Sequence, residues 1–553
     1  MHSPRKKLAF LLSFLFVSML LPAQPALTER PPKREVRAVW ITIFHNMDWP
    51  KTRAVDDVTR QQQQEELCQM LDQCKEAGIN TVLMQTRVGA CTLYPSKIEP
   101  WHKSLTGTED GDPGYDPLAF AVKECHKRGM EIQCWIAAIP VGAYNGIGAR
   151  RLREKGFPMR RFQPGTYLDP SYEEVPGYLA SLCGEMVSRY DVDGIHLDFI
   201  RYSELWPRAD SAEEADRRRG YITAIVRRIH DTVKAIKPWV KMSCSPLGKY
   251  ADLPRYSSRD WNARDRVFQE AQAWLKQGLM DQLYPMMYYQ GNNFYPFAAD
   301  WKENSCGRTV AAGLGTYFLD PREGHWQLPD VAREMMVVRQ LGLGTAHFSA
   351  INLVRNQKGI LDFTTEFYSP YPALVPAMTW ASQKKPAQPT HVELSHGLLK
   401  WQGRAPYYNV YVSDVYPVDV SDARNLLMQR YEGKSLDVRG GRQHAPHLYF
   451  AVTAMDHYGN ESAATQSHDL VESENLLAND GRTLSLPDDG RAPTASFYCI
   501  ESMQGVKVRQ FLNAYESAID ISGLPAGAYM LYTQPEGKKR ARLVGSFMVK
   551  MKQ

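Results

Sequence analysis

The sequence lacks the signatures of nucleotide-binding, nucleic-acid-binding and zinc-binding proteins. No glycine-rich phosphate loop follows the first predicted strand, which argues against an open dinucleotide-binding sheet. The net charge is only +5 over 553 residues and the basic runs are short, such as residues 217–219, so charge gives no reason to expect nucleic acid. No spacing of cysteine and histidine resembles a zinc site. We therefore expect neither a nucleic-acid partner nor a metal or other cofactor.

The cysteines do not form a disulfide framework. The nine cysteines are odd in number and irregularly spaced. Cys134 and Cys244 lie in apolar strand-like runs, and Cys68, Cys74 and Cys125 lie in helix-like runs. We expect most of them to be buried thiols that pack as small hydrophobic side chains.

Long apolar runs are also absent, apart from one at the N-terminus. Basic residues 5–7 precede the apolar residues 8–21, and this run of about 14 residues is short for a membrane span. Leu21-Pro-Ala23 offers a small-residue cleavage site, and no cysteine lies near it to carry a lipid. We expect residues 1–23 to be an export signal, so that the protein acts in the periplasm, at the cell surface or outside the cell, with no transmembrane segment after removal of the signal. An uncleaved N-terminal anchor is the alternative.

The chain is rich in aromatic residues and in alternating strand and helix patterns. Its 12 tryptophans and 29 tyrosines suit large cores, and they also suit carbohydrate sites, where sugar faces lie on aromatic rings. Eight strand-like runs alternate with helical segments over about 330 residues, which is the count for a closed parallel (β/α)8 TIM barrel. We place this barrel in residues 35–375. The predicted strands cover residues 37–44, 80–85, 131–137, 191–202, 240–245, 281–288, 309–315 and 345–350.

Two smaller all-β domains are expected after the barrel. Residues 388–470 fit a seven-stranded antiparallel sandwich and resemble a fibronectin type III domain, with Trp401 on an early strand. Residues 474–553 are also β-like, and residues 518–532 resemble the strand–turn–strand of the C-terminal sorting domains of secreted Bacteroidetes proteins. A plain third sandwich module is the alternative for this last segment.

The most informative motif is Asp191-Val-Asp-Gly-Ile-His-Leu-Asp-Phe-Ile-Arg-Tyr202. In a strand, Ile195, Leu197 and Phe199 would lie on one face. His196 and Asp198 would lie on the other face. Polar groups on a buried strand are costly unless they are hydrogen-bonded or functional. We predict that Asp198 is a catalytic carboxylate at the mouth of the barrel. The alternative is a buried Asp–Arg pair that only anchors a loop.

Further site residues follow from barrel geometry, because the carboxyl ends of the strands and the loops after them meet at one face. Carboxylates, an amide, arginines and many aromatic rings without a metal or phosphate motif describe a sugar site. The side chains that we predict to bind substrate share this placement. They are Trp40, Asp48, Gln85, Arg87, Trp135, His196, Arg201, Tyr202 and Tyr288.

Residues 35–367 resemble the glycosyl hydrolase-like 10 family of exported bacterial proteins. The resemblance depends on several motifs in order. They include RAVWIT with Asp48-Trp49-Pro50, Gly78-Ile-Asn-Thr-Val-Leu-Met-Gln-Thr-Arg87, Tyr115-Asp-Pro-Leu118, the motif containing Asp198, and Tyr284-Pro-Met-Met-Tyr288. The family implies a (β/α)8 barrel and glycosidase chemistry on a polysaccharide, either a peptidoglycan-type cell-wall glycan or another complex glycan.

Glycosidase chemistry needs two carboxyl groups. We expect Asp198 to be the nucleophile or base, with Arg201 lowering its pKa and so keeping it ionised. The candidates for the acid are Glu323 and Asp320, which follow the seventh strand, and also Asp48 and Glu204.

One departure from a known pattern leaves other functions open. The motif around Asp198 is similar to the D-G-x-D-x-D-x-E signature of chitinase-type barrels, but Ile200 stands where the acid glutamate would be. The chitinase mechanism therefore does not transfer. A barrel that binds glycan without cleaving it, displayed with β-sandwich modules, is the alternative function, and cation-dependent deacetylation is a third. Two carboxyl groups about 5–10 Å apart would favour the enzyme.

Overall fold

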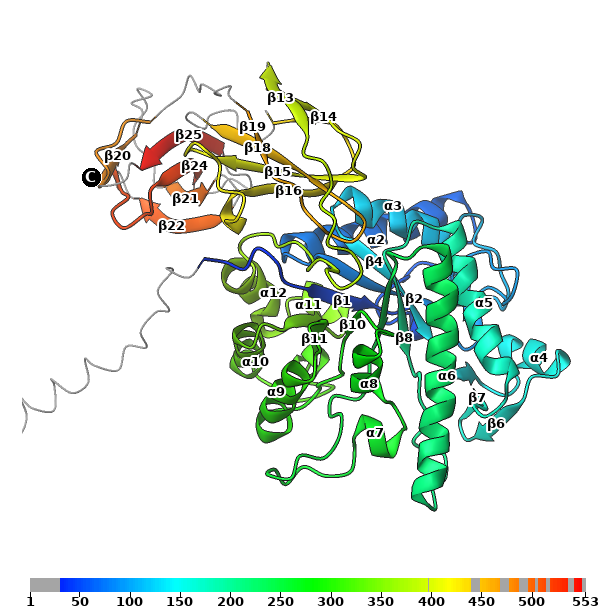
Figure 1. Ribbon diagram of the computed structural model, residues 1–553. Helices are drawn as coiled ribbons and strands as arrows, with labels where there is room; N and C mark the ends of the chain where they lie inside the picture. Colours follow the sequence, from blue (N-terminus) through cyan, green and yellow to red (C-terminus); the bar gives the residue numbers. More distant parts are fainter. Residues whose placement is uncertain are drawn as a thin grey trace, which may run out of the picture.

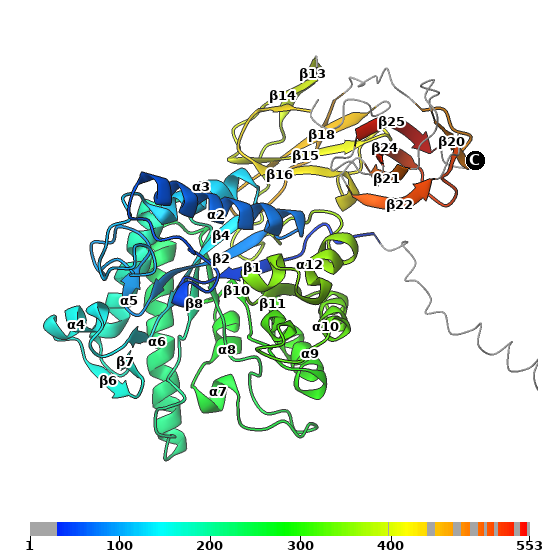
Figure 2. The ribbon, with the colours of Figure 1, turned by 180° about the vertical axis from the view of Figure 1, so that it is seen from behind.

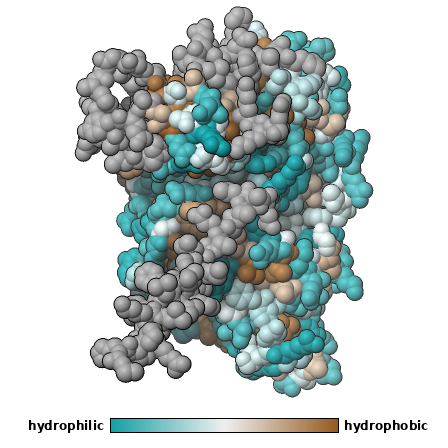
Figure 3. Space-filling model, turned by 90° about the vertical axis from the view of Figure 1, so that its left-hand side faces the viewer, coloured by the Kyte–Doolittle hydropathy of each residue, from teal (hydrophilic) through white to brown (hydrophobic). Residues whose placement is uncertain are grey.

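The structure is a computed structural model that describes residues 30–395, 397–438, 448–467, 477–486, 496–502, 506–513, 518–535 and 542–549. The predicted export signal, residues 1–23, lies outside the described residues. All nine cysteines are described, and all are free thiols, six of them buried, as predicted. Within the described part of the chain, no helix has both the length and the apolar character to cross a bilayer. The face in Figure 3 is mostly hydrophilic, with its hydrophobic residues in separate patches.

Eight parallel strands close into a barrel, which confirms the predicted fold (Figure 1). Closure is complete because the first strand pairs with both the second and the last. The strands are β1 (Arg37–Ile41), β2 (Thr81–Val88), β4 (Glu131–Ala137), β8 (Gly194–Asp198), β9 (Lys241–Cys244), β10 (Gln282–Leu283), β11 (Thr309–Leu314) and β12 (Gly344–His347). Strand β10 is much shorter than the predicted 281–288, because Pro285 has no N–H to donate to the ladder.

Helices surround the barrel (Figures 1 and 2). The principal ones are α2 (Asp57–Glu76), α3 (Pro117–Lys127), α5 (Glu174–Arg189), α6 (Ala212–Ile236), α8 (Ala271–Lys276), α9 (Tyr295–Glu303) and α10 (Leu328–Gln340). Their starts follow from local sequence: the side chains of Asp56, Asp116 and Ser211 accept hydrogen bonds from the first turns of α2, α3 and α6. The layer between strands and helices is a continuous apolar core, including Val39, Ile195 and Leu197.

Two antiparallel sheets follow the barrel. One contains β13 (Thr390–Ser395), β14 (Leu398–Gln402) and β17 (Ser435–Asp437). The other contains β15 (Tyr407–Ser413), β16 (Leu426–Tyr431), β18 (Tyr449–Met455) and β19 (Thr465–Gln466). Leu399, Trp401 and Tyr408 are buried in their shared core. The seven strands agree with the predicted number, and the fibronectin type III assignment stays a prediction.

The last segment is also built of strands. A four-stranded sheet joins β21 (Ser496–Ser502), β22 (Lys507–Asn513), β24 (Gly527–Pro535) and β25 (Arg542–Val549). A small second sheet joins β20 (Thr483–Ser485) and β23 (Ala518–Asp520). Ile500, Ile519, Leu531 and Phe547 form the buried centre. The sorting-domain resemblance stays a prediction.

The first β-domain packs against the amino end of the barrel strands (Figures 1 and 2). Arg430, at the end of β16, donates to Glu131 at 2.8 Å and to Asp193 at 2.5 Å. Glu131 begins β4, and Asp193 directly precedes β8. Gln429 also donates to the carbonyl of Gly129 at 3.1 Å. The carboxyl end of the barrel, where a (β/α)8 enzyme places its site, is therefore the opposite end.

Candidate active site

Asp198 is the last residue of β8, and its carboxylate lies at the carboxyl end of the barrel. Only 5% of the residue is exposed. Its Oδ2 accepts a hydrogen bond from the indole Nε1 of Trp135 at 3.0 Å, and its Oδ1 accepts one from the backbone N–H of Phe199 at 2.7 Å. Both carboxylate oxygens therefore have a fixed donor, which holds the group in one orientation.

A sharp backbone turn follows this carboxylate. Phe199 has a φ of 49°, in the left-handed region that side chains other than glycine rarely adopt. The strand ends here, although the predicted strand ran to residue 202. Backbone strain of this kind persists where the surrounding structure imposes it, and it is concentrated at functional sites.

Arg201 lowers the pKa of Asp198, as predicted, but the net shift of that pKa is upward, opposite to the one expected. Burial raises the pKa of Asp198 above its usual value, and the guanidinium of Arg201 and the hydrogen bonds oppose this rise without cancelling it. Arg201 instead pairs with Glu204, with Nη1 and Oε2 3.0 Å apart. The structure thus shows no buried Asp198–Arg201 ion pair that would serve only to anchor a loop.

Three aromatic rings form a wall beside Asp198. The ring of Tyr288 lies 5.6 Å from that of Tyr317 and 5.6 Å from that of Phe348, and the last two are 5.7 Å apart. Trp135 contacts the same wall through Phe348, with ring centroids 6.4 Å apart. Burial raises the pKa of Tyr288 well above its usual value, and the negative charge of Asp198 adds to this rise. Tyr288 is therefore a neutral hydroxyl beside the carboxylate.

The two acid candidates after β11 differ in environment. The carboxylate of Asp320 binds Arg322 at 2.7 Å, and hydrogen bonds from Arg322 lower the pKa of Asp320 to about 2. Asp320 is therefore a poor proton donor near neutral pH. Glu323 is exposed, and its charge adds to the burial that raises the pKa of Tyr317 to about 12. Glu323 thus lies close enough to the aromatic wall to affect Tyr317.

A chain of hydrogen bonds fills the barrel below this site. The Trp40 indole donates to Nε2 of His196 at 3.2 Å, so Nδ1 carries the imidazole proton and donates to Ser243 at 2.9 Å. Ser243 donates to Gln133 at 2.6 Å, and Gln133 to Gln282 at 2.7 Å. Burial lowers the pKa of His196 to about 3, which keeps it neutral. The structure therefore places Trp40 and His196, both predicted to bind substrate, inside the barrel and not at its mouth.

Asp48 and Gln85 shape the loop after β1. Asp48 accepts hydrogen bonds from the backbone of Thr42 at 2.8 Å and from the Ser349 hydroxyl at 2.6 Å, so it joins the loops after the first and last strands. Burial raises the pKa of Asp48 to about 6. The Gln85 carbonyl accepts from the Thr42 hydroxyl at 2.7 Å and from two backbone N–H groups. The side-chain oxygens of Asp48 and Gln85 therefore accept hydrogen bonds from other groups of the protein.

Arg87 and Tyr202 are both buried. Arg87 is fully buried, pairs with Glu99 at 2.8 Å and donates to backbone carbonyls that follow β4. Tyr202 packs in an aromatic cluster with Trp206 and Phe268. We had predicted that Arg87 and Tyr202 bind substrate. The structure does not support this contact, because each side chain is enclosed by protein.

Of the predicted residues, the structure brings Trp135, Arg201 and Tyr288 into the surroundings of Asp198. Sequence reasoning missed Phe348, because an apolar residue at a strand end looks like core. Its place directly after the eighth strand was the available signal. Across the described ranges, no group of three His, Cys, Asp or Glu side chains is arranged to hold a metal ion.

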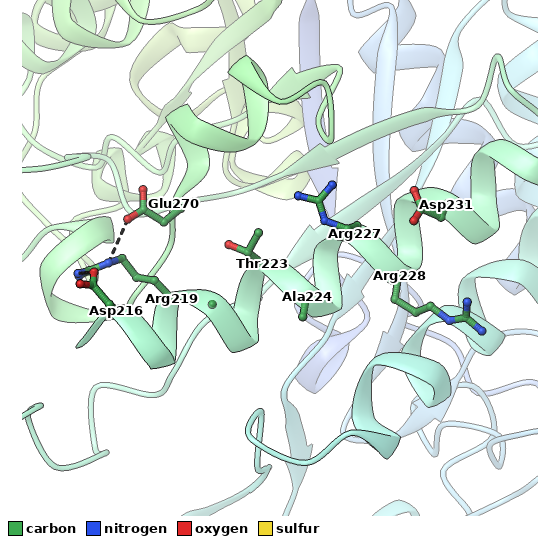
Figure 4. Close-up of a pocket in the computed structure, with 9 residues that line it drawn as sticks. Asp216, Arg219, Thr223, Ala224, Arg227, Arg228, Asp231 and Glu270 are labelled. Atoms are coloured by element: carbon green, nitrogen blue, oxygen red, sulfur yellow. Dashed lines mark hydrogen bonds and ion pairs between the residues drawn. The ribbon is translucent and has the colours of Figure 1, made fainter. Parts of the chain in front are cut away.

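A hollow of about 480 Å³ lies elsewhere, along the outer side of α6 (Figure 4). Its charged side chains are largely paired with neighbours: Arg219 binds Glu270 at 3.1 Å and Arg227 binds Gln277 at 2.8 Å. None of the residues that line it belongs to a barrel strand. We therefore do not assign the active site to this hollow.

Comparison with known proteins agrees with this geometry. The family described as "Glycosyl hydrolase-like 10" matches residues 35–205 and 201–311. "Glycosyl hydrolase YngK" of Bacillus subtilis is 31% identical over 422 residues, covering 70% of this chain and 82% of that protein. "Glycosyl hydrolase DigH" of Escherichia coli K12 is 30% identical over 310 residues, covering 49% of this chain and 70% of that protein.

Solved structures show a weaker similarity. The PgaB (BpsB) glycoside hydrolase domain from Bordetella bronchiseptica has a TM-score of 0.43 and 12% identity, covering 60% of this chain and 98% of that domain. Alpha-L-fucosidase isoenzyme 2 from Paenibacillus thiaminolyticus has a TM-score of 0.40 and 14% identity, covering 60% of this chain and 49% of the fucosidase. Similarity this low carries no conclusion about chemistry. The family match and the two relatives show that this chain belongs to the glycosyl hydrolase-like 10 family and is a glycoside hydrolase.

Proposed function

We propose that the protein hydrolyses glycosidic bonds of a peptidoglycan-type cell-wall glycan, or of a related complex polysaccharide, outside the cytoplasm. Asp198 is one member of its catalytic carboxyl pair. The observation that carries this proposal is a nearly buried carboxylate at the carboxyl end of β8, held by the indole of Trp135 and the backbone of Phe199. An aromatic wall beside it offers a surface on which a sugar face can lie.

Asp198 acts as the nucleophile or as the base that activates water. Both of its oxygens accept N–H donors, an arrangement that favours the ionised form over the acid. Burial raises its pKa, and a more basic carboxylate attacks or accepts a proton more readily near neutral pH. The raised pKa of Asp198 therefore suits a nucleophile or base because it makes the carboxylate more basic. From the sequence we had instead expected a carboxylate kept ionised by Arg201.

Glu323 is the proposed acid. Asp320 is held as a carboxylate by Arg322, and Arg201 lowers the pKa of Glu204 against the effect of partial burial. Asp48 is engaged in joining two loops. Glu323 is exposed and lies beside the aromatic wall, where it could protonate a leaving oxygen bound there.

The test compares the secreted protein with its Asp198→Asn variant on peptidoglycan strands and on a panel of plant and host glycans. We expect the wild type to release reducing ends from at least one glycan, and the variant to be slower by about a thousandfold with an unchanged melting temperature. Equal release by both proteins would remove Asp198 from the mechanism. Binding without release from any glycan would instead support a non-catalytic glycan-binding barrel.

The proposal includes export and display of the barrel by the two β-domains. It is supported by the apolar N-terminal run and by the resemblance of the C-terminal segment to sorting domains. Cell fractionation with antibodies against the barrel tests it, with a chain lacking residues 1–23 as the control. Recovery of the full chain in the cytoplasm would contradict export.

A further inference from the structure

Ser245 directly follows β9 and lies beside Asp198 across the barrel ladder. Strands β8 and β9 are parallel, with Leu197 opposite Cys244, so the next pair in this register is Asp198 and Ser245. The backbone N–H of Ser245 donates to the carbonyl of Leu197 at 3.1 Å, which continues the ladder by one residue. Side chains that are paired in this way point to the same face of a sheet. Ser245 therefore shares the face of Asp198 at the carboxyl end of the barrel.

The hydroxyl of Ser245 is buried and is not used by the fold. Only 1% of the residue is exposed, and its Oγ makes no hydrogen bond of normal geometry with the described residues. A buried hydroxyl without a partner is costly. Ser243, two residues earlier on the same strand, is fully engaged: it accepts from His196 at 2.9 Å and donates to Gln133 at 2.6 Å. Ser245 thus keeps a donor in reserve where Ser243 does not.

The carboxylate of Asp198 has room for this donor. An ionised carboxylate offers about four acceptor positions. Each oxygen of Asp198 accepts one N–H, from Trp135 and from the backbone of Phe199. The hydroxyl of Ser245 is close enough to lower the pKa of Asp198. A hydroxyl donor at this place favours the ionised carboxylate over the protonated form.

The other titratable groups around Asp198 come from three elements. Arg201, in the loop after β8, lowers the pKa of Asp198 by its charge. Burial raises the pKa of Tyr288, which follows β10, and that of the Cys244 thiol on β9, both well above their usual values. Of these three groups, only Arg201 is therefore charged near neutral pH. Besides Arg201, it is the hydrogen-bond donors that favour the ionised form of Asp198.

We propose that Ser245 is a positioning residue of the active site, whose hydroxyl donates to the ionised carboxylate of Asp198 and orients it for attack or proton acceptance. This inference rests on the proposed function at Asp198. The bond is strong only while the carboxylate is charged, so protonation of Asp198 weakens it. Burial raises the pKa of Asp198, and Ser245 limits that rise.

The experiment measures the protonation of Asp198 without any substrate. Infrared spectra of the full-length protein are recorded over a pH series, and the carboxyl band of Asp198 is identified as the one that Asp198→Asn lacks. The proteins compared are the wild type, Ser245→Ala, Ser245→Thr and the control Ser243→Ala. The control removes a buried hydroxyl from the same strand, but one that bonds to His196 and Gln133 inside the barrel.

We expect the proton affinity of Asp198 to rise by about tenfold in Ser245→Ala, because the ionised form loses a donor. Ser245→Thr, which keeps a hydroxyl, should restore most of the wild-type affinity, and Ser243→Ala should leave it unchanged. An unchanged affinity in Ser245→Ala would overturn the proposal. Equal rises in Ser245→Ala and Ser243→Ala would also overturn it, since they would reflect a general disturbance of β9.

Two further measurements complete the test. If Ser245→Ala fails to fold, Ser245→Cys replaces it, because a thiol of similar size is only a weak donor. Ser245→Cys should raise the proton affinity of Asp198 by a smaller factor, and no rise would overturn the proposal. Glycan turnover by the same proteins separates the two hypotheses. A rise in Ser245→Ala without wild-type turnover supports the contact and contradicts hydrolysis only. Wild-type turnover with no such rise contradicts this inference only.

Discussion

The indole N–H of Trp135 donates to Oδ2 of Asp198 at 3.0 Å, and the two residues come from neighbouring parallel strands. Strands β4 and β8 are in register, with Ala137 opposite Asp198, so the long indole reaches along its own strand to the carboxylate. The barrel itself, and no flexible loop, therefore sets this contact.

Replacing Trp135 with Phe should slow the reaction and change its pH dependence. The hydrogen bond lowers the pKa of Asp198, so its loss should raise that pKa further and move the acidic limb of kcat/KM to higher pH. We expect kcat to fall by about tenfold or more. The check is a pH–rate profile. Trp274→Phe is the control, since Trp274 is also buried and hydrogen-bonded, but to Thr223 on the outer side of the barrel. Equal profiles for the two variants would contradict the assignment.

Glu323→Gln and Asp320→Asn should differ in effect. If Glu323 protonates the leaving oxygen, Glu323→Gln should lose activity by about a hundredfold or more on ordinary glycosides. It should lose little on aryl glycosides, whose leaving groups need no proton. Asp320→Asn should not show this dependence on the leaving group, because Arg322 holds Asp320 ionised. Similar losses on both substrate types for Glu323→Gln would exclude it as the acid.

Glu334→Gln should stabilise the protein at neutral pH. Glu334 is buried in α10, its Oε2 has no partner among the described residues, and burial raises its pKa to about 9. The folded pKa exceeds the unfolded one, so stability is lost as pH rises above the unfolded value, about 4.3. We expect Glu334→Gln to be more stable by about 2–4 kcal/mol at pH 7.5 and by much less near pH 4.5.

Urea unfolding at the two pH values measures this difference. Glu366→Gln is the control, since Glu366 is exposed on the segment that follows α12 (Ile360–Phe363). A gain for Glu334→Gln that does not change with pH would show that ionisation of Glu334 is not its cause.

Arg430→Ala should loosen the first β-domain from the barrel and spare catalysis. Its loss leaves Glu131 and Asp193 without one cation, although Lys241 still binds Glu131 at 2.9 Å. We expect a loss of about 3 kcal/mol in unfolding free energy, with kcat unchanged. Arg424→Ala is the matched control, because Arg424 pairs with Asp422 inside the β-domain. A large fall in kcat without unfolding would contradict the separation of the interface from the site.

Strand alternation predicted the barrel and the place of Asp198, because both depend on local periodicity. The pKa of Asp198 was not predictable in the same way. Arg201 is three residues away in the sequence, but Trp135 and Tyr288, which lie around the carboxylate, come from distant segments. Arg87 also looked free for substrate, and its partner Glu99 lies on the far side of a loop. Side chains at strand ends are therefore easy to locate from sequence, whereas their partners are not.

The contact between Arg430 and the amino end of the barrel has a consequence for long substrates. The β-domains lie on the side of the amino ends of the barrel strands (Figure 1), so they leave the catalytic carboxyl end open to a polymer. If the chain is tethered by its C-terminus, the catalytic end of the barrel faces away from the tether. Such an orientation suits attack on the middle of a glycan strand as well as on its tip.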